Sequence, residues 1–543
     1  MTIIPFRGLS EKGIIHDPSP YELDANAWSD GSNVWFEDTK VVRAPVVRLV
    51  QDNLWHQPWF VWTQFSTSQG YDGVHIQAAD GTLRQYVSGV LTDITPAGFT
   101  PVSLVQSSTT TFDGDVTYLN NPSTGPFYYG PSSTQYAVLP GWDPTWTCRA
   151  LRAFGDFLIA LNVQKGAVTI NNLFKWSDLA LDGLPPASWD HTNPNLNAGE
   201  NPLEQLRSGI VDGLALKSAF VVYSTNESVL VQQTGTQAIF QFSSLYNDGG
   251  LIAPNCVEEV QGVHYCFGPN DIYRHDGTGG GKQSIVDGKN RKFIYRNLDI
   301  KKSEACFTKY LPFYKKVVFG YPSGESTAAF PAMEGYCNKL AVFDLPSGTM
   351  TFQDVPNITG YTLTNLDSAL TWNSATTADL PRTWFSTGGS WWDQRAGFDE
   401  HPVHISAIGG PVTGSRLCAI DYMNKGSLAF HYLEELNSPT FVQRDGIDLD
   451  TVGADLTTYK LIRRIYPLST MFAQAPMTVQ WGGTETPGGN ITWTQPHTFD
   501  PSTQYKLDDR KGGRFLSVKF TITFPADYEF SGFDADVTSA GRR

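Results

Sequence analysis

One pattern dominates this sequence: a short apolar strand, a turn rich in glycine, asparagine, aspartate or serine, and a second strand. Seven copies start at positions 75, 117, 158, 221, 264, 341 and 418, so successive starts differ by 42, 41, 63, 43, 77 and 77 residues. A four-stranded propeller blade takes about 40–50 residues, and a small blade hides both its faces only in a closed ring. The spacing therefore predicts a β-propeller in which some blades go unrecognised. The seven units are 75–86, 117–129, 158–170, 221–231, 264–273, 341–352 and 418–430.

Hairpins that belong to sandwiches also recur irregularly, and this alternative stays open because the units share a pattern rather than residues. A WD40 propeller in particular is not indicated. The pairs Trp142-Asp143, Trp189-Asp190 and Trp392-Asp393 are separated by 47 and 203 residues, with no matching Gly-His.

The C-terminal region has a different pattern. Apolar residues alternate with polar ones over 516–524, which is typical of a half-buried strand. Segments 478–481 and 491–494 flank glycine-rich turns and predict an antiparallel hairpin. The predicted fold class is all-β: a β-propeller with an additional small antiparallel β-domain or closing blade near the C-terminus.

These patterns also give a division of the chain. Residues 1–50 are expected to form an N-terminal β segment and docking arm, and 51–440 the propeller with inserted loops. Residues 441–543 are expected to form a C-terminal antiparallel β region that closes the propeller or packs on it. Helical signals are few, with short helices expected within 202–216 and 430–436.

The composition limits the partners of this chain. Among 543 residues, 17% are charged, 13% are aromatic, and the net charge is −15. An acidic surface repels phosphate, so tight general binding of DNA is not expected, although weak contact with DNA is compatible with it. The six cysteines show no metal-ligand spacing and are expected to be free thiols in a reduced compartment.

Sequence motifs for phosphate binding, metal binding or catalysis are absent or incomplete. Residues 276–284 superficially resemble a phosphate loop, but Asp276 and Gln283 stand where the motif needs glycine and serine or threonine. His401 and His404 flank Pro402, which argues against a helix that would place both on one face. The aspartates within 445–450 lack the calcium-loop spacing. The chain is therefore expected not to be an enzyme and to hold no metal and no cofactor.

One stretch departs from the acidic balance. Residues 282–316 carry ten basic and three acidic side chains, a local charge of +7, with aromatic residues interleaved. The functional interpretation is a surface that contacts DNA or an acidic neighbouring subunit. The alternative is a strand pair with a solvated basic face. The candidate contact residues are Lys289, Arg291, Lys292, Arg296, Lys301 and Lys302.

Four stretches resemble one family. Residues 23–45 (LDANAWSDGSNVWFEDTKVVRAP) resemble the opening of the tail nozzle proteins of short-tailed bacteriophages, also described as tail tubular or packaged-DNA stabilisation proteins. Three further segments are similar to the same group: 174–180 with 185–189, 250–255 leading to 271–277, and 514–520 through to 543. The similarity spans nearly the whole chain through loose motifs.

The resemblance implies a structural virion protein. Six copies would form a ring below the portal and adaptor proteins, extend the portal channel, retain packaged DNA and pass it during ejection. The implied partners are portal and adaptor proteins, tail fibres or spikes, and packaged double-stranded DNA in transient contact. The implied location is the virion tail, after synthesis and assembly in the host cytoplasm.

Two other functions remain open from the residues. A host-receptor or glycan-binding propeller of the tail would use some of the 15 tryptophans and 23 tyrosines, although aromatic residues more often fill blade cores. A capsule-degrading enzyme is the third class. No run of the sequence approaches the length of a membrane-spanning helix, and residues 1–20 contain no apolar stretch of the signal-peptide type.

Overall fold

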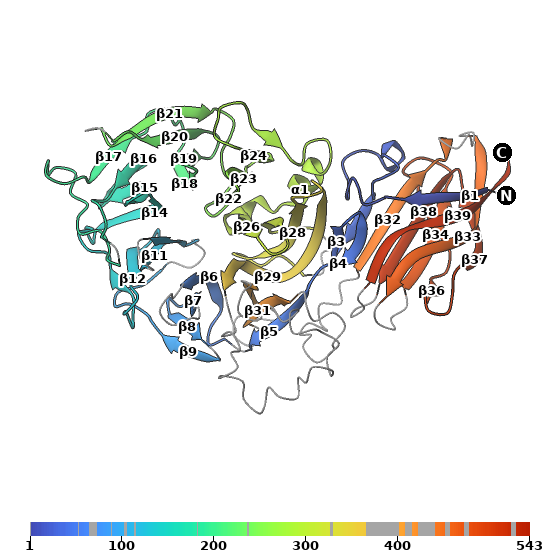
Figure 1. Ribbon diagram of the computed structural model, residues 1–543, viewed down its shortest axis with the longest axis horizontal. Helices are drawn as coiled ribbons and strands as arrows, with labels where there is room; N and C mark the ends of the chain where they lie inside the picture. The colour runs from blue at the N-terminus through green and yellow to red at the C-terminus, as the bar shows by residue number, and fades with distance from the viewer. Residues whose placement is uncertain are drawn as a thin grey trace.

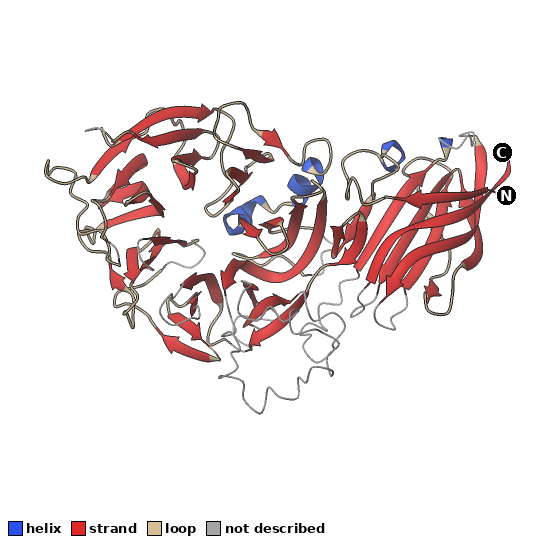
Figure 2. Cartoon of the chain, in the orientation of Figure 1, coloured by secondary structure: helices blue, strands red, loops and turns tan. Residues whose placement is uncertain are grey.

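The computed structural model of the chain is built almost entirely of β-strands (Figure 2). They form a ring of sheets with a second β-domain beside it (Figure 1). The predicted fold class, an all-β propeller with an additional antiparallel β-domain, is confirmed. The structure describes residues 2–52, 54–64, 73–87, 89–101, 106–112, 116–181, 183–235, 238–325, 330–364, 401–407, 415–421, 440–450, 457–471, 477–522 and 528–542.

Seven blades can be counted in the described part of the ring. Five are separate four-stranded antiparallel sheets, and a seven-stranded sheet supplies two more that share strand β29. The first half of β29 pairs with β28 and its second half with β30. The strands of blades 1 to 3 are β6 (Pro58–Gln64), β7 (Gly73–Ala78), β8 (Leu83–Val87), β9 (Val90–Asp93); β10 (Ser108–Phe112), β11 (Val116–Asn121), β12 (Gly125–Tyr129), β13 (Ala137–Val138); β14 (Trp146–Phe154), β15 (Phe157–Lys165), β16 (Val168–Trp176) and β17 (Gly199–Pro202).

Blades 4 to 7 continue the order, with the innermost strand first in the sequence of each blade; the innermost strand of blade 7 is the second half of β29, and the first half of β29 is the outermost strand of blade 6. In blade 7 the outermost strand comes from the N-terminal region of the chain. The strands are β18 (Ile210–Leu216), β19 (Ala219–Ser224), β20 (Ser228–Gln233), β21 (Phe240–Tyr246); β22 (Val257–Val260), β23 (Val263–Phe267), β24 (Ile272–His275), β25 (Gln283–Ser284); β26 (Phe307–Leu311), β27 (Lys316–Tyr321), β28 (Cys337–Asp344), β29 (Met350–Thr364); and β30 (His401–Ala407), β31 (Ser415–Asp421) and β5 (Val46–Gln51).

The ring is closed by β5. This strand pairs antiparallel with β31, so that Val47 lies opposite Ile420. Two segments more than 360 residues apart in the sequence thus complete one blade. The hydrogen bonds between them hold the first and last parts of the propeller together.

Each predicted hairpin lies in a different blade. In blades 1 to 5 the hairpin is the second and third strand, and in blade 6 it is β28 with β29. The unit at 418–430 begins in β31, and its second half lies outside the described residues. The wide gap before the hairpin of blade 4 reflects the long connection between β16 and β17. The gap before that of blade 6 reflects the helical segment that precedes β26.

The second domain is a β-sandwich built from both ends of the chain. Its two sheets face each other across a core in which the ring centroids of Phe520 and Phe530 lie 4.4 Å apart. One sheet contains β1 (Thr2–Arg7), β3 (Val34–Glu37), β4 (Lys40–Arg43), β33 (Thr458–Met471), β37 (Leu507–Gly513) and β39 (Tyr528–Arg542); the other contains β2 (Asp30–Ser32), β32 (Thr440–Ile447), β34 (Met477–Thr484), β35 (Thr492–Trp493), β36 (His497–Phe499) and β38 (Phe515–Ile522).

The sandwich contains the strands expected near the C-terminus. β38 covers the predicted alternating strand up to Ile522, and β34 pairs with β35 as the predicted hairpin, with Gly482 opposite Trp493. The first sheet also incorporates the N-terminus, because Thr2 pairs with Val537.

Blade 6 joins the propeller to the sandwich. The backbone N–H of Asn33 donates to the carbonyl oxygen of Phe352 at 2.8 Å, and the Asn33 side chain accepts from the N–H of Asp354 at 2.8 Å. The segment before β2 also docks on the propeller, because the rings of His16 and Phe293 stack with centroids 3.8 Å apart. The two domains therefore share a continuous core.

The helical expectations were wrong where the structure describes them. Segment 202–216 forms the end of β17, a turn and β18, because its apolar side chains Leu203, Leu206 and Ile210 pack into the core between blades 3 and 4. The segment 430–436 lies outside the described residues. The helical elements that the structure describes are α1 (Arg291–Asn297) and the 3-10 turns η1 (Pro20–Glu22) and η2 (Ile300–Ala305).

Candidate functional site

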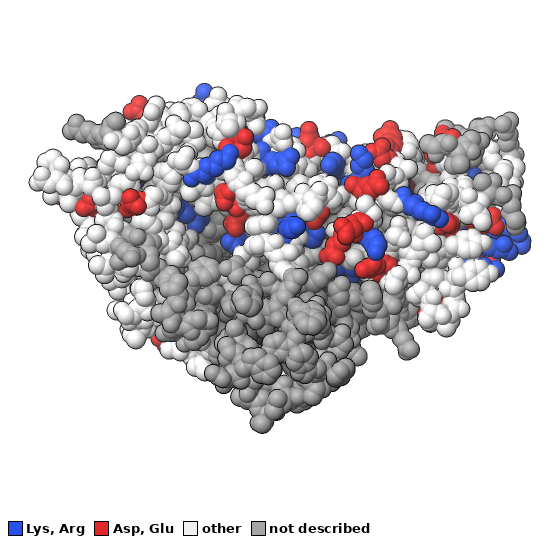
Figure 3. Space-filling model, in the orientation of Figure 1, with Lys and Arg blue, Asp and Glu red and all other residues white. Residues whose placement is uncertain are grey.

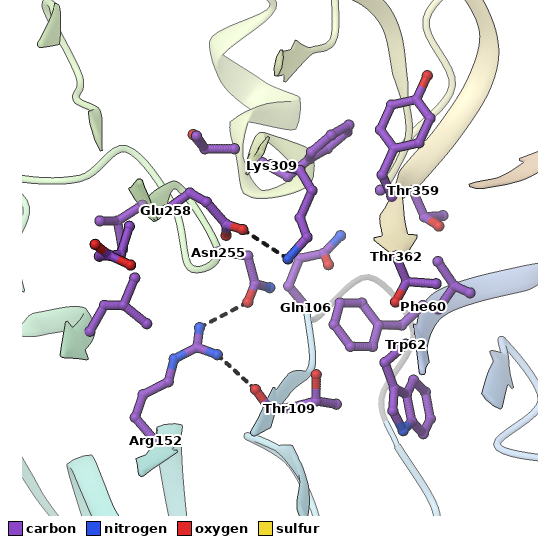
Figure 4. Close-up of a pocket in the computed structure, with 18 residues that line it drawn as sticks. Phe60, Trp62, Gln106, Thr109, Arg152, Asn255, Glu258, Lys309, Thr359 and Thr362 are labelled. Carbon is purple, nitrogen blue, oxygen red and sulfur yellow. Dashed lines mark hydrogen bonds and ion pairs between the residues drawn. The ribbon is translucent and has the colours of Figure 1, made fainter. Parts of the chain in front are cut away.

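The innermost strands of the seven blades surround a cavity of about 370 Å³ at the propeller axis (Figure 4). Each blade contributes to its wall through its first strand or the residues just before it. In blade order, lining residues include Phe60, Gln106, Thr109, Arg152, Leu214, Glu258, Lys309 and Thr362.

Arg152 in β14 organises one side of this cavity. Its guanidinium donates to Oδ1 of Asp212 at 2.8 Å, to Oδ1 of Asn255 at 2.9 Å and to the carbonyl oxygen of Thr109 at 3.0 Å. The Asp212 carboxylate is fully buried. It also accepts from the backbone N–H groups of Gly213 and Asn255, at 2.8 and 2.9 Å. Burial opposes the charge of Arg152, but the attraction of Asp212 outweighs burial and raises the pKa of Arg152.

Two contacts cross the axis of the ring. The Asn255 side chain, just before blade 5, donates to the carbonyl oxygen of Ser107, just before blade 2, at 2.9 Å. Arg149 of blade 3 forms an ion pair of 2.7 Å with Glu304, which precedes blade 6. Each of these pairs joins elements three blades apart, the widest separation in a ring of seven. The axis of the propeller is thus spanned by its own side chains and is not an open tube.

Neighbouring blades are also linked around the cavity. Lys309 of blade 6 lies 3.0 Å from a carboxylate oxygen of Glu258 in blade 5, as Figure 4 shows. The hydroxyl oxygens of Thr63 and Thr362 lie 2.7 Å apart and connect blade 1 with blade 7. The hydroxyls of Thr308 and Thr359 are buried and have no hydrogen-bond partner among the described residues.

A buried hydrogen-bonded chain connects blade 4 with blade 5. The N–H of Gly277 donates to Nδ1 of His275, and Nε2 of His275 lies 2.7 Å from the hydroxyl of Tyr223. That hydroxyl lies 2.6 Å from Nδ1 of His264, whose Nε2 lies 2.8 Å from the carbonyl oxygen of Ala215. Every group has a partner when both imidazoles are neutral. Burial lowers the pKa of His264 to about 3 and that of His275 to about 4.

A similar pair connects blade 1 with blade 2. Nδ1 of His75 in β7 lies 2.8 Å from the hydroxyl of Tyr136, which also accepts from Nε1 of Trp62 at 2.9 Å. All three side chains are buried. Burial lowers the pKa of His75 to about 3, so this imidazole is also neutral at ordinary pH.

The fold places the residues of the basic stretch 282–316 in different environments. Lys309 faces the axial cavity, and Lys316 is buried, with Nζ 2.6 Å from Oδ1 of Asp344. Lys282 pairs with Asp248 at 3.1 Å. The predicted strand pair is wrong for its central part, because residues 291–297 form α1, whose first N–H groups are capped by Asp17 from the N-terminal segment, at 2.9 Å.

The six candidate basic residues differ in their surroundings. Arg291 donates to the carbonyl oxygen of Asn270 at 2.8 Å and lies 3.5 Å from Asp287. Lys302 pairs with Asp299 at 3.3 Å. The other four are exposed and form no ion pair within the described part of the chain; we call them the basic face: Lys289, Lys292, Arg296 and Lys301.

The basic face is a small feature of the surface. Lys292 and Arg296 are one turn apart on the same side of α1. On the face of the molecule that Figure 3 shows, basic and acidic atoms are mixed along a band, with no broad area of one sign among the coloured residues. Such a surface permits local contact with an acidic partner but not strong general attraction of DNA.

No group of three or more histidine, cysteine, aspartate or glutamate side chains with the geometry of a metal site occurs within the described ranges. All six cysteines are buried, free thiols. Asp445 pairs with neighbouring protein groups, accepting from the Gln443 amide at 2.7 Å. His401 and His404 lie in strand β30, although their sequence pattern is typical of a solvent-exposed loop.

No helix in the part of the chain that the structure describes has the length and apolar character needed to cross a membrane. Burial raises the pKa of Cys148, Cys256 and Cys266 above the ordinary value, so these three thiols stay protonated at neutral pH.

Comparisons with known proteins give no family for this chain. No protein-family model matches it, and no curated protein matches it. Among solved structures, a chain in the crystal structure of the mitotic checkpoint complex is similar over 69% of this chain and 93% of that chain. The sequence identity is 10% and the TM-score is 0.37. The propeller assignment rests on the sheets described above.

Proposed function

We propose that this chain is a structural, non-catalytic subunit of the tail nozzle of a short-tailed bacteriophage. Six copies would form a ring below the portal and adaptor proteins, carry fibres or spikes, and hold the packaged genome until ejection. The proposal is supported by the sequence resemblance together with a two-domain β architecture whose core is continuous between propeller and sandwich. A stiff subunit of this kind suits a ring that must resist the pressure of confined DNA.

The observation that carries the mechanism is the closed propeller axis. Because Asn255 with Ser107 and Arg149 with Glu304 span the axis, a duplex has no path through a single subunit. In the proposed ring, the conduit is the space between subunits around the six-fold axis. Such a ring requires a heterologous interface that closes by rotation.

Particles assembled without this chain are expected to lose their packaged DNA, because nothing would seal the portal channel after packaging. The measurement is the fraction of DNA-filled heads by electron cryo-microscopy. Supplying the wild-type chain in trans is the control and should restore filled heads. Retention of DNA in particles that lack the chain would contradict the proposal.

The basic face is proposed to touch packaged DNA or an acidic neighbouring subunit. The assembled ring is expected to bind DNA only weakly. Replacing Lys292 and Arg296 together by glutamate is expected to lower this affinity further. If both residues contact phosphate, the slope of log K against log salt should fall by about 2. A matched control replaces Lys12 and Arg510, which are exposed residues elsewhere. DNA binding and assembly equal to wild type in the first variant would exclude the role.

A host-receptor or glycan-binding propeller of the tail is the second candidate function. The axial cavity favours it, because its wall combines an aromatic ring, Phe60, with amide, carboxylate and hydroxyl groups. A glycan array probed with the purified chain tests this candidate directly.

A further inference from the structure

We infer that His16 is a proton-operated latch at the junction of the two domains: its charged form holds the propeller and the sandwich together, and loss of one proton weakens that contact. The inference does not depend on the nozzle proposal. The ring of His16 stacks on that of Phe293 in α1, with centroids 3.8 Å apart. One ring nitrogen contacts Asn290 of the propeller, and the other contacts Asp30 of the sandwich.

The Asn290 side chain determines the state of Nδ1. Its Oδ1 accepts from the backbone N–H of His16 at 3.0 Å, and its Nδ2 donates to the carbonyl oxygen of Ile14 at 2.8 Å. These two bonds to backbone groups fix which end of the amide is the oxygen. Because the same oxygen lies 3.0 Å from Nδ1 of His16, Nδ1 must carry a proton.

Asp30 requires a proton on the other nitrogen. Nε2 of His16 lies 3.3 Å from Oδ1 of Asp30, which also accepts from the N–H of Gly31 at 2.8 Å. Burial opposes the charge of Asp30, but the contact with His16 helps to outweigh burial, and the pKa of Asp30 is lowered. An ionised carboxylate only accepts hydrogen bonds, so Nε2 must donate. Both nitrogens are therefore satisfied only in the imidazolium form.

The other charged groups around the ring have partners or are exposed. The Asp17 carboxylate, next in the chain, accepts from two N–H groups of α1 at 2.9 Å. Lys519 of β38 attracts the charge of Asp30, and Asp445 of β32 repels it. The exposed basic side chains at the start of α1 are Lys289, Arg291 and Lys292. Among these residue types, histidine is the one that ordinarily changes its charge between pH 5 and 8.

Loss of the proton has a predictable direction. A neutral ring keeps one N–H and cannot donate to both Asn290 and Asp30, so one contact then places two acceptors against each other. Asp17, which caps α1, is adjacent to His16, so the first N–H groups of α1 should become more open to exchange. This sense is opposite to that of the three buried histidines described above, because their neutral forms are the ones that burial favours.

The first measurement is the protonation state of His16. It uses the full chain labelled with nitrogen-15 histidine and reads the NMR shifts of both ring nitrogens. The chain has ten histidines, and the His16→Gln variant assigns the signal by its loss. We expect both nitrogens of His16 to be protonated at pH 6 and one of them at pH 9. A ring with a single proton at pH 6 would overturn the inference.

The second measurement is hydrogen exchange of segment 289–297 at pH 6 and pH 8.5, corrected for the intrinsic pH dependence of exchange. Protection in the wild-type chain should fall about tenfold between the two pH values, the effect of losing one hydrogen bond to a charged group. In His16→Gln it should be equal at both. In Asp30→Asn it should change less than in wild type, since an amide can donate to a neutral Nε2.

A matched control is a histidine–aspartate pair elsewhere in the sandwich. Nε2 of His497 lies 2.7 Å from Oδ2 of Asp509, and its ring stacks on that of Trp481. His497→Gln should leave the pH response of α1 as in wild type. An equal pH response in the wild-type chain and in His16→Gln would also overturn the inference. Neither measurement involves DNA or ring assembly, so failure of the nozzle proposal would leave the latch standing.

Discussion

Replacing Asp212 by alanine is expected to destabilise the propeller by about 3–5 kcal/mol, because it leaves the buried Arg152 guanidinium without its counter-charge. The Arg152 side chain is 11% exposed and that of Asp212 is 0% exposed, so water compensates neither group. The same change removes the acceptor of two backbone N–H groups, those of Gly213 and Asn255. The measurement is the midpoint of urea unfolding followed by intrinsic fluorescence.

Two variants separate the buried charge from a general effect of losing a carboxylate. Asp508→Ala removes a side chain that is 54% exposed and paired with Arg464, and it should cost less than about 1 kcal/mol. Arg152→Met combined with Asp212→Leu removes both buried charges and should be more stable than Asp212→Ala alone. We call the bonded set of Arg152, Asp212, Asn255, Thr109 and Ser107 the axial network. If Asp212→Ala were no more harmful than Asp508→Ala, the assignment of Arg152 as the centre of this network would be wrong.

Acidification from pH 7.5 to pH 5.5 is expected to remove about 4 kcal/mol of stability through three histidines. His75, His264 and His275 are buried and neutral, with pKa values of about 3, about 3 and about 4. In the unfolded chain the pKa of each is near 6.5. The unfolded state therefore takes up protons as the pH falls below 6.5, while the folded state does not.

Acid therefore lowers the free energy of unfolding. The stabilisation is complete above pH 6.5, decreases as the pH falls toward 4, and has been lost once the pH is below the folded pKa values. The thermal midpoint should fall by about 3–4 °C over the same two pH units. Calorimetry in buffers of different ionisation enthalpy would count the protons taken up on unfolding.

Histidine variants test the origin of the effect. His264→Gln with His275→Gln should lower stability at pH 7.5 and also flatten its dependence on pH, because two of the three titrating groups are gone. His191→Gln is the control, since that side chain is 36% exposed. A pH dependence that is equally steep in the double variant would show that other groups cause the acid sensitivity.

The hairpin pattern was enough to predict the propeller because each blade contains a tight, locally encoded turn between adjacent strands. The strands that pair over long distances were not visible in the same way. Nothing local in Val46–Gln51 indicates that it pairs with Ser415–Asp421, and the incorporation of Thr2–Arg7 into the C-terminal sheet is equally non-local. Helix α1 was missed because it is only seven residues long and begins at Arg291, after a glycine-rich stretch.

The candidate site was predictable only in part. The run of basic residues was evident from composition, but the sequence does not say that Lys316 is buried and Lys309 faces the axis while Lys292 is exposed. Residues of the axial network come from four different blades and are ordinary polar residues in their local sequence. One weak signal was Asp212 before Gly213, an aspartate inside an apolar strand pattern, which requires a buried partner.

The pairing of β5 with β31 has a consequence for how the chain is made. The ribosome releases residue 51 long before residue 421, and the intervening 370 residues (421 − 51) take about 20–70 s to translate. Throughout that interval the nascent protein holds an unpaired strand and a gap where the final blade belongs. During this interval the unpaired strand can be bound by chaperones or can pair with other chains and aggregate. The yield of folded protein in heterologous expression should therefore depend on the rate of translation more than on the stability of the finished fold.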